Sequence, residues 1–160
     1  MIDELIDELK TLRLNIYKKY NRHVSIQDIL SDRWETAKFY GFGSGTSCYN
    51  NVLILGDVTV GKNCWIGPNV VLDGTGGLII GDNVDISAGA QIYTHHTVNR
   101  AISNGAEMIQ KKPTKIGSGV YIGPNSILQM GINVGDSSII GALSFVNKDI
   151  PKNGKFYSRK

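Results

Sequence analysis

Residues 114–146, TKIGSGVYIGPNSILQMGINVGDSSIIGALSFV, repeat an aliphatic residue at every sixth position. The repeated residues are Ile116, Ile122, Leu128, Val134, Ile140 and Val146. A small or apolar residue stands two positions before each of them, and glycine follows most of them. Side chains two positions apart share one side of a strand, and glycine suits a tight corner. A short strand and a corner that recur every six residues predict a hexapeptide β-solenoid.

The same spacing continues upstream and is interrupted at two places. Its members there are Val60, Ile66, Leu72, Ile80, Ile86 and Ile92. The step from Leu72 to Ile80 is eight residues, and the step from Ile92 to Ile116 is twenty-four. The surplus of the longer step over six residues equals one full coil, but polar residues would then have to face the core. We therefore expect residues 97–112 to form an excursion loop, and long loops on rigid scaffolds often carry function.

Length and composition predict one globular domain. The chain has 160 residues, of which 41% are hydrophobic, and a net charge of +3 that is too small to indicate a nucleic-acid partner. No apolar run approaches the length of a membrane span, and no secretory leader is recognisable, so we expect a soluble cytoplasmic protein. The two cysteines do not suggest a disulfide framework. Cys64 falls on an inward position, whereas Cys48 is expected to be more exposed.

The chain is expected to divide into four segments. Residues 1–40 should form a helical cap that covers the open end of the solenoid, since exposed strand edges promote association. Within it, residues 1–20 carry an apolar stripe of Ile2, Leu5, Ile6, Leu9, Leu12 and Ile16, and Ser25 is a candidate N-cap of a second helix. A linker (41–50), the solenoid (51–151) and a basic tail (152–160) would follow.

His95 is the candidate catalytic residue, because it lies at the root of the excursion loop. Its register places it at a corner, facing outward, with His96 facing the other way. A zinc site is disfavoured, because the chain holds only three histidines and no acidic cluster surrounds them. We expect no metal.

The chain resembles the left-handed β-helix acyltransferases. The resemblance rests on the hexads, the stretch 92–95 (IYTH), the excursion loop, and the closing segments 139–142 (IIGA) and 146–151 (VNKDIP), and it covers about residues 50–151. Within that superfamily the pattern is most similar to bacterial sugar O-acetyltransferases related to the maltose and galactoside enzymes. The resemblance implies an all-β fold, namely a left-handed parallel β-helix. It also implies a role in polysaccharide biosynthesis.

The resemblance also implies the chemistry. Such enzymes transfer an acetyl group directly from acetyl-CoA to a hydroxyl of a sugar or nucleotide sugar, with histidine as the general base. Imidazole suits this role because it titrates near neutral pH. His95 would take the proton from the attacking hydroxyl and return it to the departing sulfur of CoA. His96 remains an alternative base.

Further site residues come from counting coils together with the resemblance. Gly123 and Gly141 fall in one corner column, and backbone groups near them and near Ala142 would hold the pantetheine arm, with Lys148 near the nucleotide phosphates. The count stacks His95 above the expanded corner 73–77. The candidates for orienting the imidazole or the acceptor are Asn69, Asp73 and Thr75. His95 and the glycine column occupy different corners, which trimerisation could bring together, and a homotrimer with shared clefts is also what the resemblance implies.

Other functions remain compatible with the pattern. One alternative is N-acetylation of an amino sugar nucleotide, and another is O-acetylation of a small acceptor such as serine. A non-catalytic hexapeptide scaffold is the alternative from a different class. The sequence does not identify the acceptor.

Overall fold

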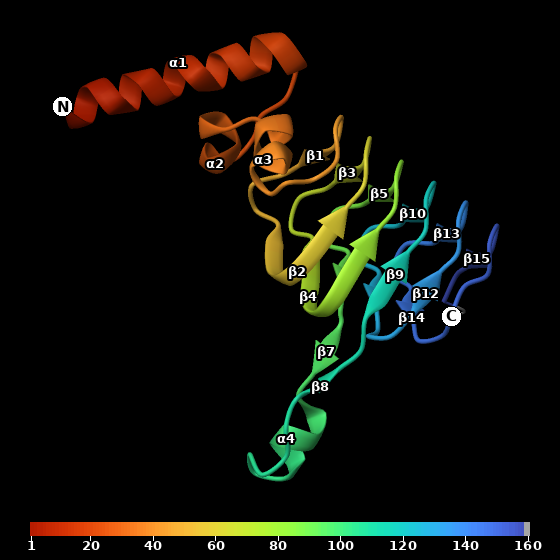
Figure 1. The fold of residues 1–160 in the computed structure, drawn as a ribbon. Helices are drawn as coiled ribbons and strands as arrows, with labels where there is room; N and C mark the ends of the chain where they lie inside the picture. The colour runs from red at the N-terminus through yellow and green to blue at the C-terminus, as the bar shows by residue number, and fades with distance from the viewer. Residues whose placement is uncertain (159–160) are drawn as a thin grey trace.

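The computed structural model describes residues 1–158, which form a parallel β-solenoid with helices at its N-terminal end and one excursion from its side (Figure 1). The solenoid is a left-handed β-helix of about six turns, which confirms the predicted fold class. Each turn contributes a short strand to each of three faces. The residues of the six-residue repeat point inward and are buried in one continuous core.

The strands of one face stack in parallel along the axis. Face one consists of β1 (Ser47–Cys48), β3 (Trp65–Ile66), β5 (Asp85–Ile86), β10 (Tyr121–Ile122), β13 (Ile139–Ile140) and β15 (Lys155–Phe156). Face two consists of the first halves of β2 (Leu53–Val60) and β4 (Val71–Ile80), then β6 (Gln91–Ile92), β11 (Ile127–Leu128) and β14 (Phe145–Val146). Face three consists of the second halves of β2 and β4, then β9 (Thr114–Ile116), β12 (Asn133–Val134) and a bridge to Ile150.

The pairing register reflects the two interruptions of the repeat. Regular neighbours such as Ile122 and Ile140 lie eighteen residues apart, which is three hexads. Leu72 pairs with Ile92, twenty residues on, because the corner at 73–77 holds two extra residues. We call the turn between faces one and two the first corner and the turn between faces two and three, which includes 73–77, the second corner.

The solenoid extends beyond the predicted range of 51–151 at both ends. Cys48 on β1 is fully buried, in contrast to its expected exposure, and lies one hexad before Ile54. At the other end β15 pairs with β13, so part of the predicted basic tail continues face one. The repeat steps by only four residues from Val146 to the buried Ile150 and then by six to Phe156. Counting strictly by six therefore missed the last strand.

Three helices precede the solenoid, and only the shorter ones lie against it. The helix α3 (Arg33–Phe39) packs on β1, buries Ala37, and begins with a capping box formed by Asp32 and Glu35. The helix α2 (Ile26–Leu30) follows Ser25 as predicted, but the Ser25 hydroxyl donates to the Asp28 carboxylate instead of capping the backbone. Figure 1 shows α1 (Ile2–Tyr20) beyond α2, with no buried residue, so it does not cover the open end.

The excursion is a hairpin that leaves the second corner. It runs through β7 (His95–His96), the short helix α4 (Val98–Ile102) and β8 (Gln110–Lys111), and β7 and β8 pair antiparallel. Figure 1 shows it reaching away from the body of the solenoid. Among the described residues, no helix combines the length and the apolar character that crossing a membrane requires.

Candidate active site

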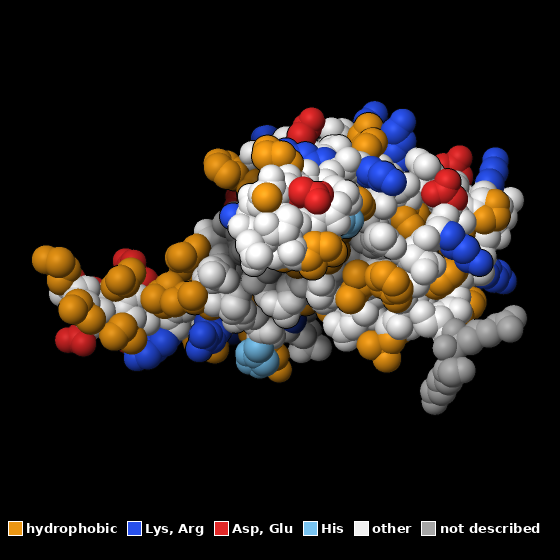
Figure 2. Space-filling model, turned by 90° about the horizontal axis from the view of Figure 1, so that it is seen from below, with side chains coloured by type: hydrophobic (Ala, Val, Ile, Leu, Met, Phe, Trp, Pro, Cys, Tyr) orange, Lys and Arg blue, Asp and Glu red, His pale blue; other side chains and the backbone are white. Residues whose placement is uncertain are grey.

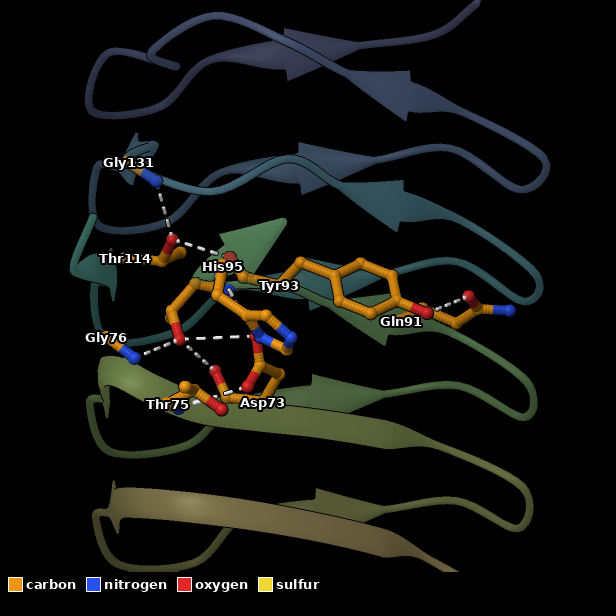
Figure 3. Close-up of polar contacts among 9 residues, drawn as sticks. Asp73, Thr75, Gly76, Gln91, Tyr93, His95, Thr114 and Gly131 are labelled. Atoms are coloured by element: carbon orange, nitrogen blue, oxygen red, sulfur yellow. Dashed lines mark hydrogen bonds and ion pairs between the residues drawn. The ribbon is translucent and has the colours of Figure 1, made fainter. Parts of the chain in front are cut away.

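The Asp73 carboxylate and the His95 imidazole meet at the second corner, where the hairpin begins (Figure 3). Asp73 ends the first half of β4 and is fully buried. Its Oδ2 atom lies 2.6 Å from His95 Nδ1 and accepts hydrogen bonds from the backbone N–H groups of Thr94 (2.7 Å) and His95 (3.1 Å). Its Oδ1 atom accepts from the Thr75 N–H at 3.0 Å. Both carboxylate oxygens of Asp73 are thus held by hydrogen bonds from the backbone around His95 and the second corner.

These contacts decide the charge of Asp73. Burial raises the pKa of its carboxyl group, but the hydrogen bonds from Thr75, Thr94 and His95 outweigh this effect and hold the pKa well below its usual range. Asp73 is therefore an anion at neutral pH. It stabilises the imidazole whenever that ring gains a proton.

The low pKa of Asp73 predicts a specific acid sensitivity. Because the pKa is lower in the folded chain than in the unfolded chain, the stabilisation is present above about pH 4 and is lost as the pH falls. For this group the free energy of unfolding should fall by up to about 1.4 kcal/mol per pH unit below that point. Urea denaturation at pH 7, 5, 4 and 3 measures this. The difference in stability between wild type and Asp73→Asn should shrink with falling pH, and a constant difference would contradict the assignment.

The contact with Asp73 sets the tautomer of His95. A carboxylate oxygen at 2.6 Å can only accept, so Nδ1 carries the hydrogen and Nε2 keeps its lone pair. The ring is 23% exposed and lines a shallow pocket of about 360 Å³ together with Tyr93, His96, Thr97 and Val98. None of the described residues donates to Nε2. This atom can accept a proton from a hydroxyl that enters the pocket.

Two buried threonines fix the base of the hairpin. Thr94 Oγ1 donates to the Asp73 carbonyl oxygen at 2.7 Å and accepts from the Gly76 N–H at 2.8 Å. Thr114 Oγ1 donates to the Tyr93 carbonyl oxygen, 2.9 Å away, and accepts from the Gly131 N–H at 3.0 Å. Hydrogen bonds from both sides of the excursion therefore tie His95 to neighbouring coils.

Sequence reasoning missed Thr94, Tyr93 and Gln91 as parts of this site. The Tyr93 hydroxyl donates to Gln91 Oε1 at 2.8 Å, and Figure 3 shows the tyrosine beside the imidazole. Thr94 stands two positions after Ile92 and therefore points inward. A polar residue at an inward position was the signal in the sequence that could have identified Thr94 as part of the site.

The other predicted acceptor-side residues take different places. Thr75 is next to Asp73 and contributes its backbone N–H. Asn69 lies at the first corner, where its side-chain oxygen accepts from Asn51, so it is separate from the Asp73–His95 pair of the same chain. His96 lies on the adjacent position, and its Nδ1 accepts weakly from the Val98 N–H at 3.4 Å. It has no carboxylate partner among the described residues.

The structure shows which backbone N–H groups near the predicted glycine column are already engaged in the sheet. Gly123 and Gly141 do share a column, but the Gly123 N–H donates to the Ile140 carbonyl and the Gly141 N–H to the Phe156 carbonyl, each at 2.8 Å. Both N–H groups are therefore already used in hydrogen bonds between the strands of face one. The Ala142 N–H donates to no described residue, and neither does the Ala88 N–H at the same corner two coils earlier.

Lys148 occupies a different column from these glycines. It follows β14, so it lies at the second corner, two coils beyond His95. Its ammonium group lies 5.9 Å from the centre of the Phe156 ring. Within residues 1–158, no three histidine, cysteine or acidic side chains gather closely enough to hold a metal ion.

A cysteine nucleophile is not available at the site. Burial raises the pKa of the Cys48 thiol to about 12, and Cys64 is also buried in the core. Both thiols are therefore protonated at neutral pH and closed to solvent.

The chain is similar in sequence to known hexapeptide-repeat proteins. A family model described as the hexapeptide repeat of succinyl-transferase matches residues 57–94 and 113–148, on either side of the hairpin. The galactoside O-acetyltransferase of Escherichia coli K12 is 35% identical over 98 residues, which cover 61% of this chain and 48% of that protein. The chain thus spans about half the length of this curated relative.

Solved structures share the fold. A hexapeptide-repeat acetyltransferase of Vibrio cholerae, complexed with acetyl-CoA, superimposes with a TM-score of 0.57 at 24% identity, covering 96% of this chain and 84% of that one. An N-acyltransferase of Bacillus cereus in complex with dTDP and CoA gives a TM-score of 0.66 at 20% identity, covering 73% and 67%. Because both identities are below 25%, these two matches show a shared fold alone.

Proposed function

The chain belongs to the hexapeptide-repeat superfamily of left-handed β-helix acyltransferases, and on this premise we propose that it transfers an acetyl group from acetyl-CoA to a sugar hydroxyl. The observation that carries the proposal is the Asp73–His95 pair, whose imidazole lines an open pocket. The sequence similarity to a galactoside O-acetyltransferase supports a hydroxyl acceptor.

His95 acts as the general base. Its Nε2 atom takes the proton of the acceptor hydroxyl as that oxygen bonds to the thioester carbonyl carbon. Asp73, which is anionic, stabilises the imidazolium through Nδ1. When the carbon–sulfur bond of the tetrahedral intermediate breaks, His95 returns the proton to the departing sulfur. The products are the acetyl ester and CoA with a free thiol, and no acetyl-enzyme forms.

The thioester has to reach His95 from another corner. The free N–H of Ala142 lies at the first corner, whereas His95 lies at the second. A homotrimer would bring the second corner of one subunit next to the first corner of its neighbour, so each site would draw on two chains. In this arrangement Ala142 holds the pantetheine arm, and Lys148 attracts the phosphates of CoA.

A coupled thiol assay tests the proposed activity. CoA released from acetyl-CoA is followed with a thiol reagent while galactosides, maltose, nucleotide sugars, amino sugars and serine are offered in turn. Both cysteines of the chain are buried, so the protein itself should contribute little background. We expect release that depends on a sugar hydroxyl and yields an ester.

The outcomes separate the alternatives. Release that requires an amino group, with an amide product, would replace O-acetylation by N-acetylation. Calorimetry that detects no binding of acetyl-CoA, together with no CoA release from any acceptor, would favour the non-catalytic scaffold.

A further inference from the structure

The first helix projects from the molecule with its apolar side chains uncovered. Figure 2 shows it as an arm on the left, with hydrophobic side chains along its length. Ile2 is 74% exposed, Leu5 55% and Leu12 40%, and no residue of α1 is buried. A helix of 19 residues gains most of its stability from packing on an apolar surface. An apolar stripe of this length therefore calls for a partner.

The stripe has the spacing of a coiled-coil seam. Its members alternate at steps of three and four residues: Ile2, Leu5, Leu9, Leu12 and Ile16. These are the a and d positions of a heptad pattern, which fit the surface of a second helix of the same kind. The expected occupant is thus an α-helix with a matching seam.

Charge along α1 identifies that helix as a second copy in the opposite direction. Four acidic residues lie in the first half, at Asp3, Glu4, Asp7 and Glu8, together with one basic residue, Lys10, whereas the second half holds Arg13, Lys18 and Lys19 and no acidic residue. Parallel copies would place acid against acid and base against base. Antiparallel copies place each acidic half beside the basic half of the partner, and their helix dipoles then oppose as well.

The seam is self-complementary in one register. With the two helices antiparallel about a point between residues 10 and 11, Leu9 meets Leu12, Leu5 meets Ile16, and Ile2 meets the stem of Lys19. The seam also continues into a groove of about 230 Å³ between α1 and α2, lined by Leu12, Ile16 and Leu30 among others. The N-terminal half of a partner helix can lie along this groove.

We propose that α1 is a dimerisation arm that pairs antiparallel with α1 of a second copy of this chain. The pairing uses no residue of the active site and does not rest on the proposed function. It joins whatever assembly the solenoids form into pairs, so a trimer of solenoids would become a larger, even-numbered assembly.

The mass of the full chain in solution tests the arm. We expect Leu5→Glu with Leu12→Glu, which puts two charges into the seam, to halve the mass measured by light scattering after gel filtration. Thr11→Glu with Leu14→Glu adds the same charges at exposed positions outside the seam and should leave the mass unchanged. Circular dichroism checks that each variant is folded. Equal masses for wild type and the seam variant would overturn the proposal.

Cross-linking tests the direction. Chains carrying Leu9→Cys, mixed with chains carrying Leu12→Cys, should form a disulfide-linked pair of unlike chains, whereas Leu9→Cys alone should not. Cross-linking of Leu9→Cys with itself would show a parallel pair and overturn the antiparallel arrangement. A lipid surface is the alternative partner of the arm. It would be assigned if the wild type sediments with anionic phosphatidylglycerol vesicles, the seam variant does not, and both have the same mass in solution.

Discussion

Replacing His95 with alanine is expected to lower kcat by about 10²–10⁴-fold, the usual contribution of a general base. The substitution removes the atom that accepts the hydroxyl proton, while the backbone at the root of the hairpin remains anchored by Thr94. Because the proposed contacts with acetyl-CoA are made by Ala142 and Lys148 and not by the imidazole, binding of acetyl-CoA should be retained. Initial rates of CoA release and isothermal titration with acetyl-CoA measure the two quantities.

The neighbouring histidine is the matched control. His96 has the same chemistry and a similar exposure but no carboxylate partner among residues 1–158. His96→Ala should therefore reduce kcat by less than about 10-fold. Unchanged transfer in His95→Ala, with a collapse in His96→Ala, would move the base to the second histidine. Unchanged transfer in both would exclude a histidine base.

Replacing Asp73 with asparagine is expected to lower kcat by about 10²-fold, because the positioning of His95 depends on an acceptor at Nδ1. Oδ2 accepts from the N–H groups of Thr94 and His95 and from the ring Nδ1, with the Thr94 hydroxyl 3.3 Å away as well. An amide nitrogen at this position would itself donate, so His95 would move its hydrogen to Nε2 and lose its function as a base. Stability should fall by about 1–3 kcal/mol as well, since a buried donor loses its partner.

Two measurements separate positioning from general loss of structure. Nitrogen-15 NMR of the histidine rings should show the hydrogen on Nδ1 of His95 in wild type and on Nε2 in Asp73→Asn. Asp82→Asn is the matched control, because Asp82 also accepts a backbone N–H at a corner, from Lys62, but contacts no histidine. An unchanged tautomer in Asp73→Asn, or an equal loss of activity in Asp82→Asn, would contradict the role of Asp73.

Much of the solenoid could be predicted because its rules are local. A residue such as Ile122 is inward because of its position in its own hexad, and its partner Ile140 lies three hexads on. The two interruptions were equally readable, since a step of eight or twenty-four residues is visible without coordinates. The prediction failed at the two ends: it began after the buried strand β1 at Ser47–Cys48, and the change of step between Val146 and Ile150 concealed the strand that ends at Phe156.

The site was predictable only in outline. The stacking of His95 above the corner 73–77 follows from the sum of the coil lengths, but Asn69, Asp73 and Thr75 all remained candidates for its partner. Asp73 is the partner because its side chain points inward at the enlarged corner. There its carboxylate accepts hydrogen bonds from the N–H groups of Thr94, Thr75 and His95. Likewise, only the pairing of face one shows that the Gly123 and Gly141 amides are occupied.

The sequence by itself therefore determined the scaffold, the position of the excursion and the histidine at its root, because strand period and corner length act between near neighbours. The tertiary structure alone decided which carboxylate holds that histidine, which amides of the first corner are engaged, and that α1 projects instead of covering the open end. These features depend on hydrogen-bond partners and packing surfaces supplied by residues in other coils or in other elements. The period of the repeat predicts which residues stack, but not where a side chain points or which acceptor an amide finds.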